Sequence, residues 1–404
     1  MCNEKSLQFA FSLRPTPPGN HLLKSLDSVS EELYPLDIYF CRNCNHVQLG
    51  HSVNPEILYQ RNYTYVSSTS PIFVEHLRNF ANTMSHKFHL KGKFVIDIGS
   101  NDGTCLSFFK ESGSQVLGID PSKEVSGIAL ENNVETINDF FGLELAKKIK
   151  TKYGKAKFIT SHNACAHIDN LFDVIQGAEH LLKKDGVLCI EVGYFLDVYE
   201  NIWFDTIYHE HLDYHTVAPF EKLFDRANLS LFDVQRIAPQ GGSIRLLAQK
   251  SDGPYEKLPS VQKLIDNERA RGLSDINTVK KFETRIKEVK LKLREILVDI
   301  KKSGKTIAGY GAPTKATTLM QYFEIDRNLL DFVVDDNPLK QDMYTPISHL
   351  KIYKPEVIYS KKPDFVLILA WNFSDSIIRK HKKYSDEIGS FIVPMPVPKI
   401  VDLK

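Results

Sequence analysis

Short apolar segments alternate with helix-like segments twice along this chain, and this alternation limits its fold more than any other feature. The first series begins at Lys93 and the second follows Gly304. Short apolar strands separated by helices are typical of a parallel sheet that is buried on both faces. The expected strands are 94–98, 115–119, 134–137, 158–160, 186–191, 306–310, 332–335 and 365–369. The sequence therefore predicts an α/β protein with two separate doubly wound sheets.

The remaining segments divide the 404 residues into three expected domains. Residues 1–69 are rich in turns, proline and aromatic residues, and they predict a small N-terminal domain. Apolar residues spaced three and four apart predict a helix over 70–87 and a long amphipathic helix over 275–303. We expect the second domain to cover 70–274, and the third to cover 275–404 and to begin with the long helix.

Composition and charge argue against several classes of protein. The formal net charge is +1, so no overall charge favours nucleic acid or a membrane surface. No apolar run reaches the roughly 18 to 20 residues that span a bilayer, and the first residues lack a secretion signal. We expect a cytoplasmic monomer with reduced thiols and with no nucleic-acid or membrane partner.

Three of the six cysteines lie within the first 44 residues. In a reducing cytosol, this grouping points to a metal site rather than to disulfides. Cys41 and Cys44 form a C-x-x-C pair, which is half of the ligand set of a structural zinc site, and Cys2 is the third candidate ligand. A lone C-x-x-C can also be a redox pair or two buried thiols, so these alternatives stay open.

The turn after the strand over 94–98 has the features of a cofactor cradle. In Asp97-Ile-Gly-Ser-Asn-Asp-Gly103, two glycines permit a close approach of the backbone to a ligand. The turn lacks the G-x-G-x-x-G spacing of a dinucleotide fold and the lysine of a P-loop. Asp97 suits a cationic amino-acid head group, and Asp120, at the end of the next strand, suits the hydroxyls of a ribose.

A third strand end completes this candidate site. Asn138-Asp-Phe140 offers an amide or a carboxylate to an adenine amine, and an aromatic ring to the adenine face. Three suitable groups at three successive strand ends favour S-adenosylmethionine over the alternative, a generic Rossmann-like turn. The candidate cofactor-binding residues are Asp97, Gly99, Asn101, Asp102, Gly103, Asp120, Pro121, Asn138, Asp139, Phe140 and Asn163.

The segment Tyr208-His-Glu-His211 gathers a phenol, a carboxylate and two imidazoles within four positions. Imidazole and carboxylate groups can act as general bases, and a phenol can donate a hydrogen bond to an oxyanion. The segment is therefore a candidate for acid–base chemistry. A metal site or a polar helix end is the alternative, but the segment lacks the i, i+4 histidine pair of a zincin.

Ordered motifs along nearly the whole chain resemble those of one family, the C-methyltransferases of nucleotide-linked deoxy-keto-sugars. The motifs are Cys41-Arg-Asn-Cys-Asn-His-Val-Gln-Leu49, Tyr65-Val-Ser-Ser-Thr-Ser70, the cofactor turn, Asn163-Ala-Cys-Ala-His-Ile168, Tyr208-His-Glu-His211, Gly241-Gly-Ser-Ile-Arg245, Gly309-Tyr-Gly-Ala-Pro-Thr-Lys315 and Asp335-Asp-Asn-Pro338. The resemblance implies a small zinc-knuckle-like domain, a class I methyltransferase domain and a C-terminal Rossmann-like domain that helps to bind a sugar nucleotide. It also implies S-adenosylmethionine as the cofactor and a 4-keto-deoxysugar methylated at the carbon next to its ketone.

The same resemblance assigns roles to individual side chains. His211 resembles the family's base, and Glu210 and Tyr208 resemble groups that position it or contact the sugar. His167 resembles a further active-site histidine, although a lone histidine is more often a satisfied core residue. An additional active-site phenol corresponds to Tyr63 or Tyr65, and the sequence leaves that choice open.

Two glycine-containing segments are expected to hold the substrate. The first follows Gln240, where the family usually has histidine, and the second opens the helix after residue 310. Backbone amides at such a helix start, together with Lys315, can hold phosphate oxygens. A hairpin turn and a purely structural Rossmann domain are the alternatives. The candidate substrate-binding residues are Gly242, Ser243, Arg245, Tyr310, Gly311, Ala312, Lys315, Asp335 and Asn337.

The N-terminal cysteines depart from the family pattern. The family has a second C-x-x-C near its N-terminus, whereas only Cys2 remains here. The site is therefore three-coordinate, completed by another group such as His51, or lost.

Other functions remain as alternatives to carbon methylation. They are O-methylation of another small molecule by the same architecture and non-catalytic binding of a sugar nucleotide. The presence of Asp97, Asp120, Glu210 and His211 argues against the second. An NAD-linked oxidoreductase is disfavoured by both glycine loops.

Overall fold

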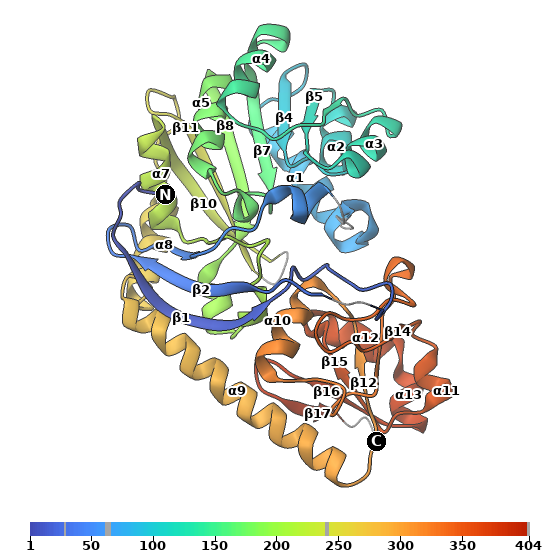
Figure 1. Ribbon diagram of the computed structural model, residues 1–404. Helices are drawn as coiled ribbons and strands as arrows, with labels where there is room; N and C mark the ends of the chain where they lie inside the picture. Colours follow the sequence, from blue (N-terminus) through green and yellow to red (C-terminus); the bar gives the residue numbers. More distant parts are fainter. Residues whose placement is uncertain (28–29, 61–65, 239–241, 402–404) are drawn as a thin grey trace.

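A computed structural model describes residues 1–27, 30–60, 66–238 and 242–401. The chain forms three sheets, of four, seven and six strands (Figure 1). The two larger sheets are built mostly of parallel strands with helices packed on them. This confirms the α/β class and the two doubly wound units. The expected domain limits, after residues 69 and 274, stay predictions.

The central sheet has seven strands in the order β10-β11-β8-β7-β4-β5-β6. Strand β11 is antiparallel to both of its neighbours, and the strands from β4 to β8 are parallel. The strands are β4 (Phe94–Ile98), β5 (Gln115–Ile119), β6 (Thr136–Ile137), β7 (Ala156–His162), β8 (Leu182–Gly193), β10 (Leu229–Ile237) and β11 (Ser243–Lys250). All five side chains of β4 are buried, which explains its continuous apolar run.

Helices cover both faces of this sheet. One face carries α1 and α2, whose apolar residues pack with Val95, and the other carries α4 and α5, which pack with Ile96. The helices of this part are α1 (Pro71–Lys87), α2 (Thr104–Glu111), α3 (Lys123–Glu131), α4 (Leu143–Tyr153), α5 (Leu171–Leu181), α6 (Phe195–Glu200), α7 (Val217–Arg226) and α8 (Pro259–Ala270).

The N-terminal sheet is antiparallel and reaches into the middle of the chain. Its order is β1-β2-β3-β9, with β1 (Leu7–Thr16), β2 (Tyr34–Cys41), β3 (Val47–Leu49) and β9 (Asp213–Tyr214). Because β9 follows His211 directly, this sheet holds one end of the segment that contains the candidate base.

The C-terminal sheet has the order β14-β13-β12-β15-β16-β17 and is parallel except at β17. Its strands are β12 (Ile307–Tyr310), β13 (Phe332–Val334), β14 (Ile352–Tyr353), β15 (Phe365–Ile368), β16 (Ser390–Val393) and β17 (Lys399–Val401). Its helices are α10 (Thr314–Phe323), α11 (Val357–Lys361), α12 (Ser374–Lys380) and α13 (Lys382–Glu387).

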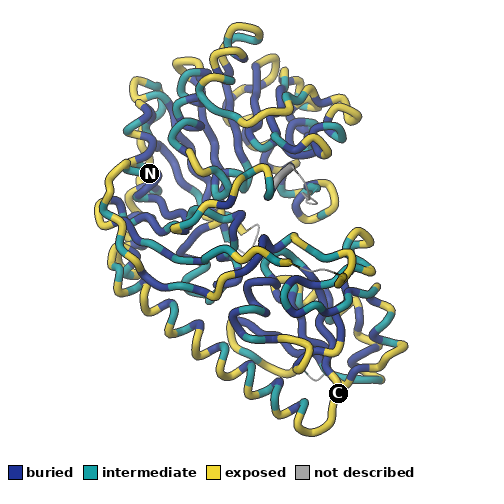
Figure 2. Tube along the Cα trace, viewed as in Figure 1, coloured by how far each residue is buried: buried dark blue, intermediate teal, exposed yellow. Residues whose placement is uncertain are grey.

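Helix α9 (Ile276–Lys302) connects the two large sheets. Buried and exposed residues alternate along it in Figure 2, as expected for a helix with one apolar face. Phe282 on that face packs edge-on against Phe11 of β1, with ring centroids 6.0 Å apart.

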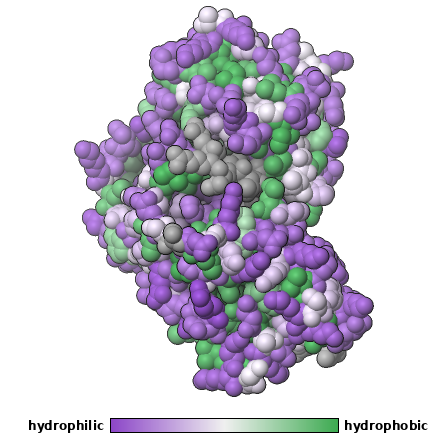
Figure 3. All heavy atoms as spheres, turned by 45° about the vertical axis from the view of Figure 1, so that its right-hand side comes forward, coloured by the Kyte–Doolittle hydropathy of each residue, from purple (hydrophilic) through white to green (hydrophobic). Residues whose placement is uncertain are grey.

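Hydrophilic residues cover most of the molecular surface that Figure 3 shows. In the part of the chain that the structure describes, no helix is both long and apolar enough to cross a membrane.

Short helical segments occur in the loops. They are the π-helical η1 (Glu56–Gln60) and the 3₁₀ segments η2 (Ser67–Thr69), η3 (Cys165–His167), η4 (Phe204–Thr206), η6 (Pro338–Lys340) and η7 (Trp371–Phe373). Of these, η3 contains the candidate residue His167, and η6 begins directly after the candidate residue Asn337.

Candidate active site

The turn between β4 and α2 requires glycine at two positions. Gly99 has a φ of +74° and Gly103 a φ of +77°, a region that other residues avoid. A Cβ atom added to Gly99 would also lie only 2.6 Å from the Cβ atom of Ala164, in the loop after β7. The cradle therefore lies directly against the Asn163–His167 loop, and Asn163 itself has a φ of +54°.

Asp97 is buried at the end of β4 without a full set of hydrogen bonds. Among the described residues, its Oδ1 atom has no partner. Burial raises its pKa to about 7, although the charge of His162 lowers it in part. An uncompensated buried carboxylate is costly, so a cationic ligand group at this oxygen would be stabilising.

Asp120 marks the end of β5, and its oxygens accept hydrogen bonds from the backbone amides of Asn101 and Ser122, both at 2.9 Å. The Asn138 amide donates to the Asp120 carbonyl at 3.0 Å, so this amide is used within the protein. Phe140 keeps 45% of its surface exposed, which leaves its ring available for stacking.

Asn101 and Asp102 hold a neighbouring segment against the cradle. The Asn101 carboxamide oxygen and an Asp102 carboxylate oxygen each accept a backbone hydrogen bond from η2, from Ser67 and Ser68 respectively, at 2.9 Å. Asp102 is completely buried and also accepts from Thr104. These two side chains therefore hold η2 and α1 against the cradle, and their contact with the cofactor stays a prediction.

The remaining features of the cradle fit S-adenosylmethionine. The Asp97 oxygen that lacks a hydrogen-bond partner suits the amino group of the cofactor, and the two glycines leave room for its methionine part. The exposed Phe140 ring suits stacking on its adenine. Pro121 is half-buried beside Asp120, and Asp139 accepts from the Phe140 amide at 2.8 Å. The residues that follow β6, the third of the strands with candidate cofactor-binding residues at their ends, thus form the outer edge of the cradle.

His211, at the end of the Tyr208–His211 segment, is held in one tautomer. His211 Nδ1 lies 2.9 Å from the Thr206 carbonyl oxygen, which only accepts, so Nδ1 carries the proton. His211 Nε2 is 2.9 Å from the Tyr208 hydroxyl and accepts its hydrogen bond. Burial, with a smaller contribution from His167, lowers the pKa of His211 to about 3. His211 is therefore a neutral imidazole with its lone pair on Nε2.

His167 brings the loop after β7 to the same place. Its ring meets that of His211 edge-on, with centroids 4.9 Å apart, and burial lowers its pKa to about 4. The amide of Leu212 donates to the carbonyl of Ala166 at 2.7 Å. Because Ala164 of this loop contacts Gly99, the cradle and the histidine pair are neighbours across one loop.

Glu210 points toward the C-terminal domain. It accepts a hydrogen bond from the Asn20 amide at 3.0 Å, and the Asn20 oxygen accepts from the Thr314 hydroxyl at 2.7 Å. Burial raises the pKa of Glu210 to about 7. Asn20 could not be predicted from the sequence, because nothing in its turn-rich surroundings indicates that it lies between two other parts of the chain.

Tyr63, Tyr65, Gln240 and Gly241 lie outside the described residues. The choice between the two tyrosines and the effect of glutamine at position 240 therefore stay predictions. Gly242 has a φ of +146°, and an added Cβ would meet the Asp197 carboxylate at 2.3 Å. Ser243, the first residue of β11, is buried.

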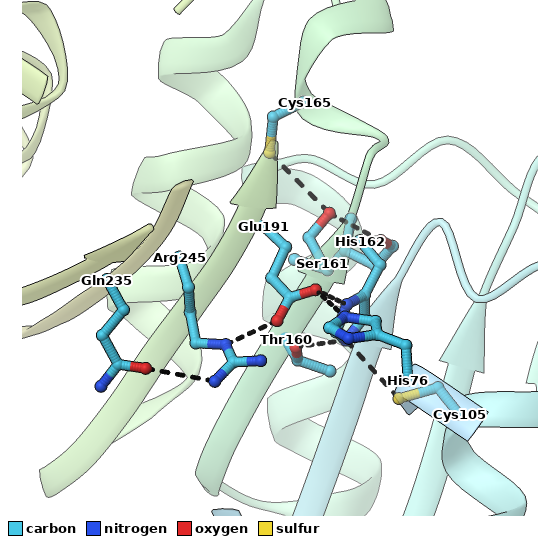
Figure 4. A network of polar contacts seen from close by, with 10 residues as sticks. His76, Cys105, Thr160, Ser161, His162, Cys165, Glu191, Gln235 and Arg245 are labelled. Atoms are coloured by element: carbon cyan, nitrogen blue, oxygen red, sulfur yellow. Dashed lines mark hydrogen bonds and ion pairs between the residues drawn. The ribbon is translucent and has the colours of Figure 1, made fainter. Parts of the chain in front are cut away.

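Arg245 does not lie where the sequence placed it. Its Nε atom donates to Glu191 at 2.5 Å, and Nη1 donates to Gln235 at 3.2 Å (Figure 4). The other Glu191 oxygen is 2.7 Å from His76 Nε2 and 3.1 Å from His162 Nδ1. Arg245 is thus neutralised inside the central sheet, beneath α1, and its contact with substrate stays a prediction.

The histidines and the glutamate of this network lie close enough to hold a metal ion. Arg245 already occupies the second Glu191 oxygen and supplies the balancing positive charge. The distances between the histidine nitrogens and Glu191 are those of hydrogen bonds. We interpret the network as a structural one that joins α1, β7, β8, β10 and β11.

The glycine loop of the C-terminal domain borders a cavity of about 630 Å³. Gly311 and Ala312 line it together with the 345–348 segment. Asp335 instead accepts backbone hydrogen bonds from Ala312 and Asn337, at 2.6 and 2.7 Å, and so holds the loop in place.

Three other predicted substrate residues are engaged elsewhere. Tyr310 is buried and donates to Asp336 at 3.0 Å, Asn337 accepts from the Leu339 amide at 3.0 Å, and Lys315 faces Asp205. The lysine at the glycine loop is Lys340, whose amino group donates to the Ala312 carbonyl at 2.8 Å. No sequence motif marked Lys340, because 25 residues separate it from Lys315 and only the fold brings it to the loop.

The three N-terminal cysteines do come together. The sulfur atoms of Cys2 and Cys41 are 3.6 Å apart, and those of Cys2, Cys41 and Cys44 all lie within 4.8 Å of one another. Within the described ranges, no histidine, aspartate or glutamate joins this group. His51, the suggested fourth ligand, instead stacks on Tyr34 with centroids 5.7 Å apart. Three thiols are the ligands that this site offers to zinc.

We expect the full-length chain to carry about one zinc ion, bound through these thiols. Substituting Cys41→Ser should remove the metal and lower the midpoint of thermal unfolding. The reason is that the metal then no longer cross-links the N-terminus, at Cys2, to the turn that contains Cys44. Elemental analysis of the purified protein measures the first effect and thermal unfolding the second. Cys189→Ala, which alters a buried thiol of β8, serves as the control, and unchanged zinc in Cys41→Ser would contradict the assignment.

Comparisons with known proteins agree with this architecture. Three family descriptions match the chain in order: "Putative zinc binding domain" over residues 1–59, "Methyltransferase domain" over 73–234, and "C-methyltransferase C-terminal domain" over 238–396. The C-methyltransferase NovU from Streptomyces niveus is 33% identical over 403 residues, which cover 99% of this chain and 96% of NovU.

More distant relatives match a part of the chain. A ubiquinone biosynthesis O-methyltransferase from Actinobacillus pleuropneumoniae serotype 7 (strain AP76) is 28% identical over 129 residues, covering 30% of this chain and 51% of the relative. The crystal structure of magnesium protoporphyrin IX methyltransferase from Synechocystis PCC 6803 with bound S-adenosylmethionine is 15% identical. It covers 44% of this chain and 79% of that chain, with a TM-score of 0.34.

The fold and the cradle define a class I methyltransferase that uses S-adenosylmethionine. The full-length relationship to NovU narrows the class further: the chain belongs to the C-methyltransferase family, with a zinc-binding type of N-terminal domain and the family's own C-terminal domain.

Proposed function

We propose that this C-methyltransferase acts on a nucleotide-linked 4-keto-deoxysugar and methylates the carbon next to the ketone. The Tyr208–His211 pair is the observation that carries the proposal. It combines a neutral imidazole, which can take a proton, with a phenol, which can hold an oxyanion. Enolisation beside a ketone needs both functions at adjacent atoms.

In the proposed reaction, the ketone oxygen replaces His211 Nε2 as the acceptor of the Tyr208 hydroxyl. That exchange frees the Nε2 lone pair to remove the α proton. The low pKa of His211 opposes protonation before substrate binds, whereas the developing enolate charge favours the imidazolium. The Thr206 carbonyl keeps its hydrogen bond to Nδ1–H and stabilises the charged ring. Bound S-adenosylmethionine supplies the electrophilic methyl group.

Glu210 and His167 complete the proposed acceptor site. Glu210 is positioned by Asn20 and has a pKa of about 7, so it can accept a hydrogen bond from a sugar hydroxyl when it is ionised. His167 lies against the His211 ring and belongs to the loop that contacts the cradle. We propose that these residues orient the sugar between the cofactor and the base.

The nucleotide portion is proposed to bind at the C-terminal glycine loop. Gly311 and Ala312 border the cavity, and Lys340 supplies a half-buried cation at the same loop. Main-chain amides and a lysine are suited to diphosphate oxygens. We also propose that the protein acts as a cytoplasmic monomer.

A methyl-transfer screen tests this function. Purified protein and S-adenosylmethionine are incubated with nucleotide-linked 4-keto-deoxysugars and with matched 4-hydroxy analogues, and products are detected by mass. We expect a gain of one methyl group only with 4-keto compounds, because the 4-hydroxy analogues cannot enolise. Methylation of the 4-hydroxy analogues would favour O-methylation, and calorimetry that shows no binding of S-adenosylmethionine would exclude a methyltransferase.

A further inference from the structure

Helix α10 of the C-terminal domain contacts the candidate catalytic segment on both sides of Thr206. On one side, the Lys315 amino group lies 3.9 Å from an Asp205 carboxylate oxygen. On the other, the Thr318 hydroxyl donates to the Ile207 carbonyl at 2.9 Å. The residue between these two contacts supplies the carbonyl that fixes the proton of His211 on Nδ1.

The Lys315 contact is built as a structural ion pair. Asp205 is completely buried, and its Oδ2 atom also accepts from the Trp371 indole at 2.6 Å. The Lys315 amino group lies over the same indole, 4.0 Å from the ring centroid. The lysine side chain is 15% exposed, so its charge is directed inward rather than toward a solvent-accessible phosphate site.

Neighbouring aromatic contacts make this junction rigid. Phe204 stacks on Phe323 of α10 with ring centroids 4.7 Å apart. The ring centroids of Trp203 and Trp371 are 5.8 Å apart. The segment of η4 is therefore packed against the C-terminal domain along its length. A carbonyl group at its end cannot turn without disturbing these contacts.

We propose that Lys315 and Thr318 are positioning residues that hold the Thr206 carbonyl, and through it the tautomer and orientation of His211. This inference rests on the proposed role of His211 as the base. It assigns to Lys315 a function different from phosphate binding. The glycine loop opens the same helix, so substrate bound there and the base are held by one rigid element, α10.

A spectroscopic measurement on the full-length protein tests the inference without substrate. Nitrogen chemical shifts of ¹⁵N-labelled histidine report which ring nitrogen of His211 carries the proton. We expect the Nδ1–H form alone in the unmodified protein and a mixture of tautomers in Lys315→Met. Thr318→Val, which lacks the hydroxyl, should show the same change, and Thr318→Ser, which keeps it, should not.

Measurements on two lysine variants distinguish a role of Lys315 in positioning His211 from a role in phosphate binding. Calorimetry with thymidine diphosphate and uridine diphosphate should show the same Kd for Lys315→Met as for the unmodified protein, and a Kd about tenfold higher or more for Lys340→Met. In a substrate assay, Lys315→Met should lower kcat about 10- to 100-fold while KM stays nearly constant. Lys301→Met, which removes a surface ion pair with Asp331, is the control.

Two results would overturn the inference. One is a His211 tautomer in Lys315→Met that is identical to that of the unmodified protein. The other is a weakened affinity for the diphosphates in Lys315→Met, which would return Lys315 to a phosphate-binding role. Failure of the proposed function is distinguishable, because it would appear as absent methyl transfer in the unmodified protein with the His211 tautomer still fixed.

Discussion

Substituting His211→Asn should lower the rate of methyl transfer about 10³- to 10⁴-fold, with little change in the affinity for S-adenosylmethionine. Asparagine can keep a hydrogen bond to the Thr206 carbonyl, but it offers no basic nitrogen to Tyr208. A general base typically contributes this magnitude to a rate. The rate is measured from initial velocities with saturating cofactor, and cofactor binding by calorimetry.

Graded variants distinguish loss of the base from loss of structure. Tyr208→Phe removes the hydroxyl and keeps the ring, and we expect a loss of about 10- to 1000-fold because the enolate oxygen loses one donor. His180→Asn, in α5 and away from the site, should keep full activity. Undiminished activity of His211→Asn would exclude His211 as the base and leave Glu210, whose pKa is about 7, as the next candidate.

The second large effect concerns Asp97 and the pH dependence of cofactor binding. Burial raises the pKa of Asp97 to about 7, so it loses its charge as the pH falls through neutrality. The cofactor's amino group is a cation, and we expect the ionised carboxylate of Asp97 to bind it. The Kd for S-adenosylmethionine should therefore be constant above about pH 8, and it should rise up to about tenfold for each pH unit below 7.

Asp97→Asn is the variant that tests this dependence. It should raise the Kd about 10- to 100-fold at pH 8 and nearly abolish the variation of Kd between pH 5.5 and 8, because the amide does not titrate. Calorimetry over this pH range gives both quantities. Asp139→Asn, at the exposed outer edge, should keep the pH dependence, and a pH-independent Kd in the unmodified protein would contradict the role of Asp97.

The parts of the fold that depend on local sequence could be predicted well. The strands at 94–98 and 115–119 and the long helix α9 follow from continuous apolar runs and from helical spacing, which are local signals. The glycines of the cradle could be predicted for the same reason. Their turn needs positive φ values within seven residues of sequence.

The positions of charged side chains could not be predicted in the same way. Arg245 follows a conspicuous glycine pair, yet its strand inserts beside β8 and directs it to Glu191, 54 residues earlier. Lys315 follows a phosphate-type loop, yet Asp205 and Trp371 surround its amino group. These partners are distant in sequence, and no local pattern encodes a pairing over such a separation.

The most direct test of the central claim is exchange of the substrate's α hydrogen with solvent. An accepted nucleotide-linked 4-keto-deoxysugar is incubated with the protein in deuterium oxide, without S-adenosylmethionine, and deuterium is located by NMR. We expect deuterium at the carbon next to the ketone, which is the position that is methylated when cofactor is added. With His211→Asn, this exchange should be at least about 100-fold slower. A substrate that is methylated but shows no enzyme-dependent exchange at that carbon would contradict this expectation.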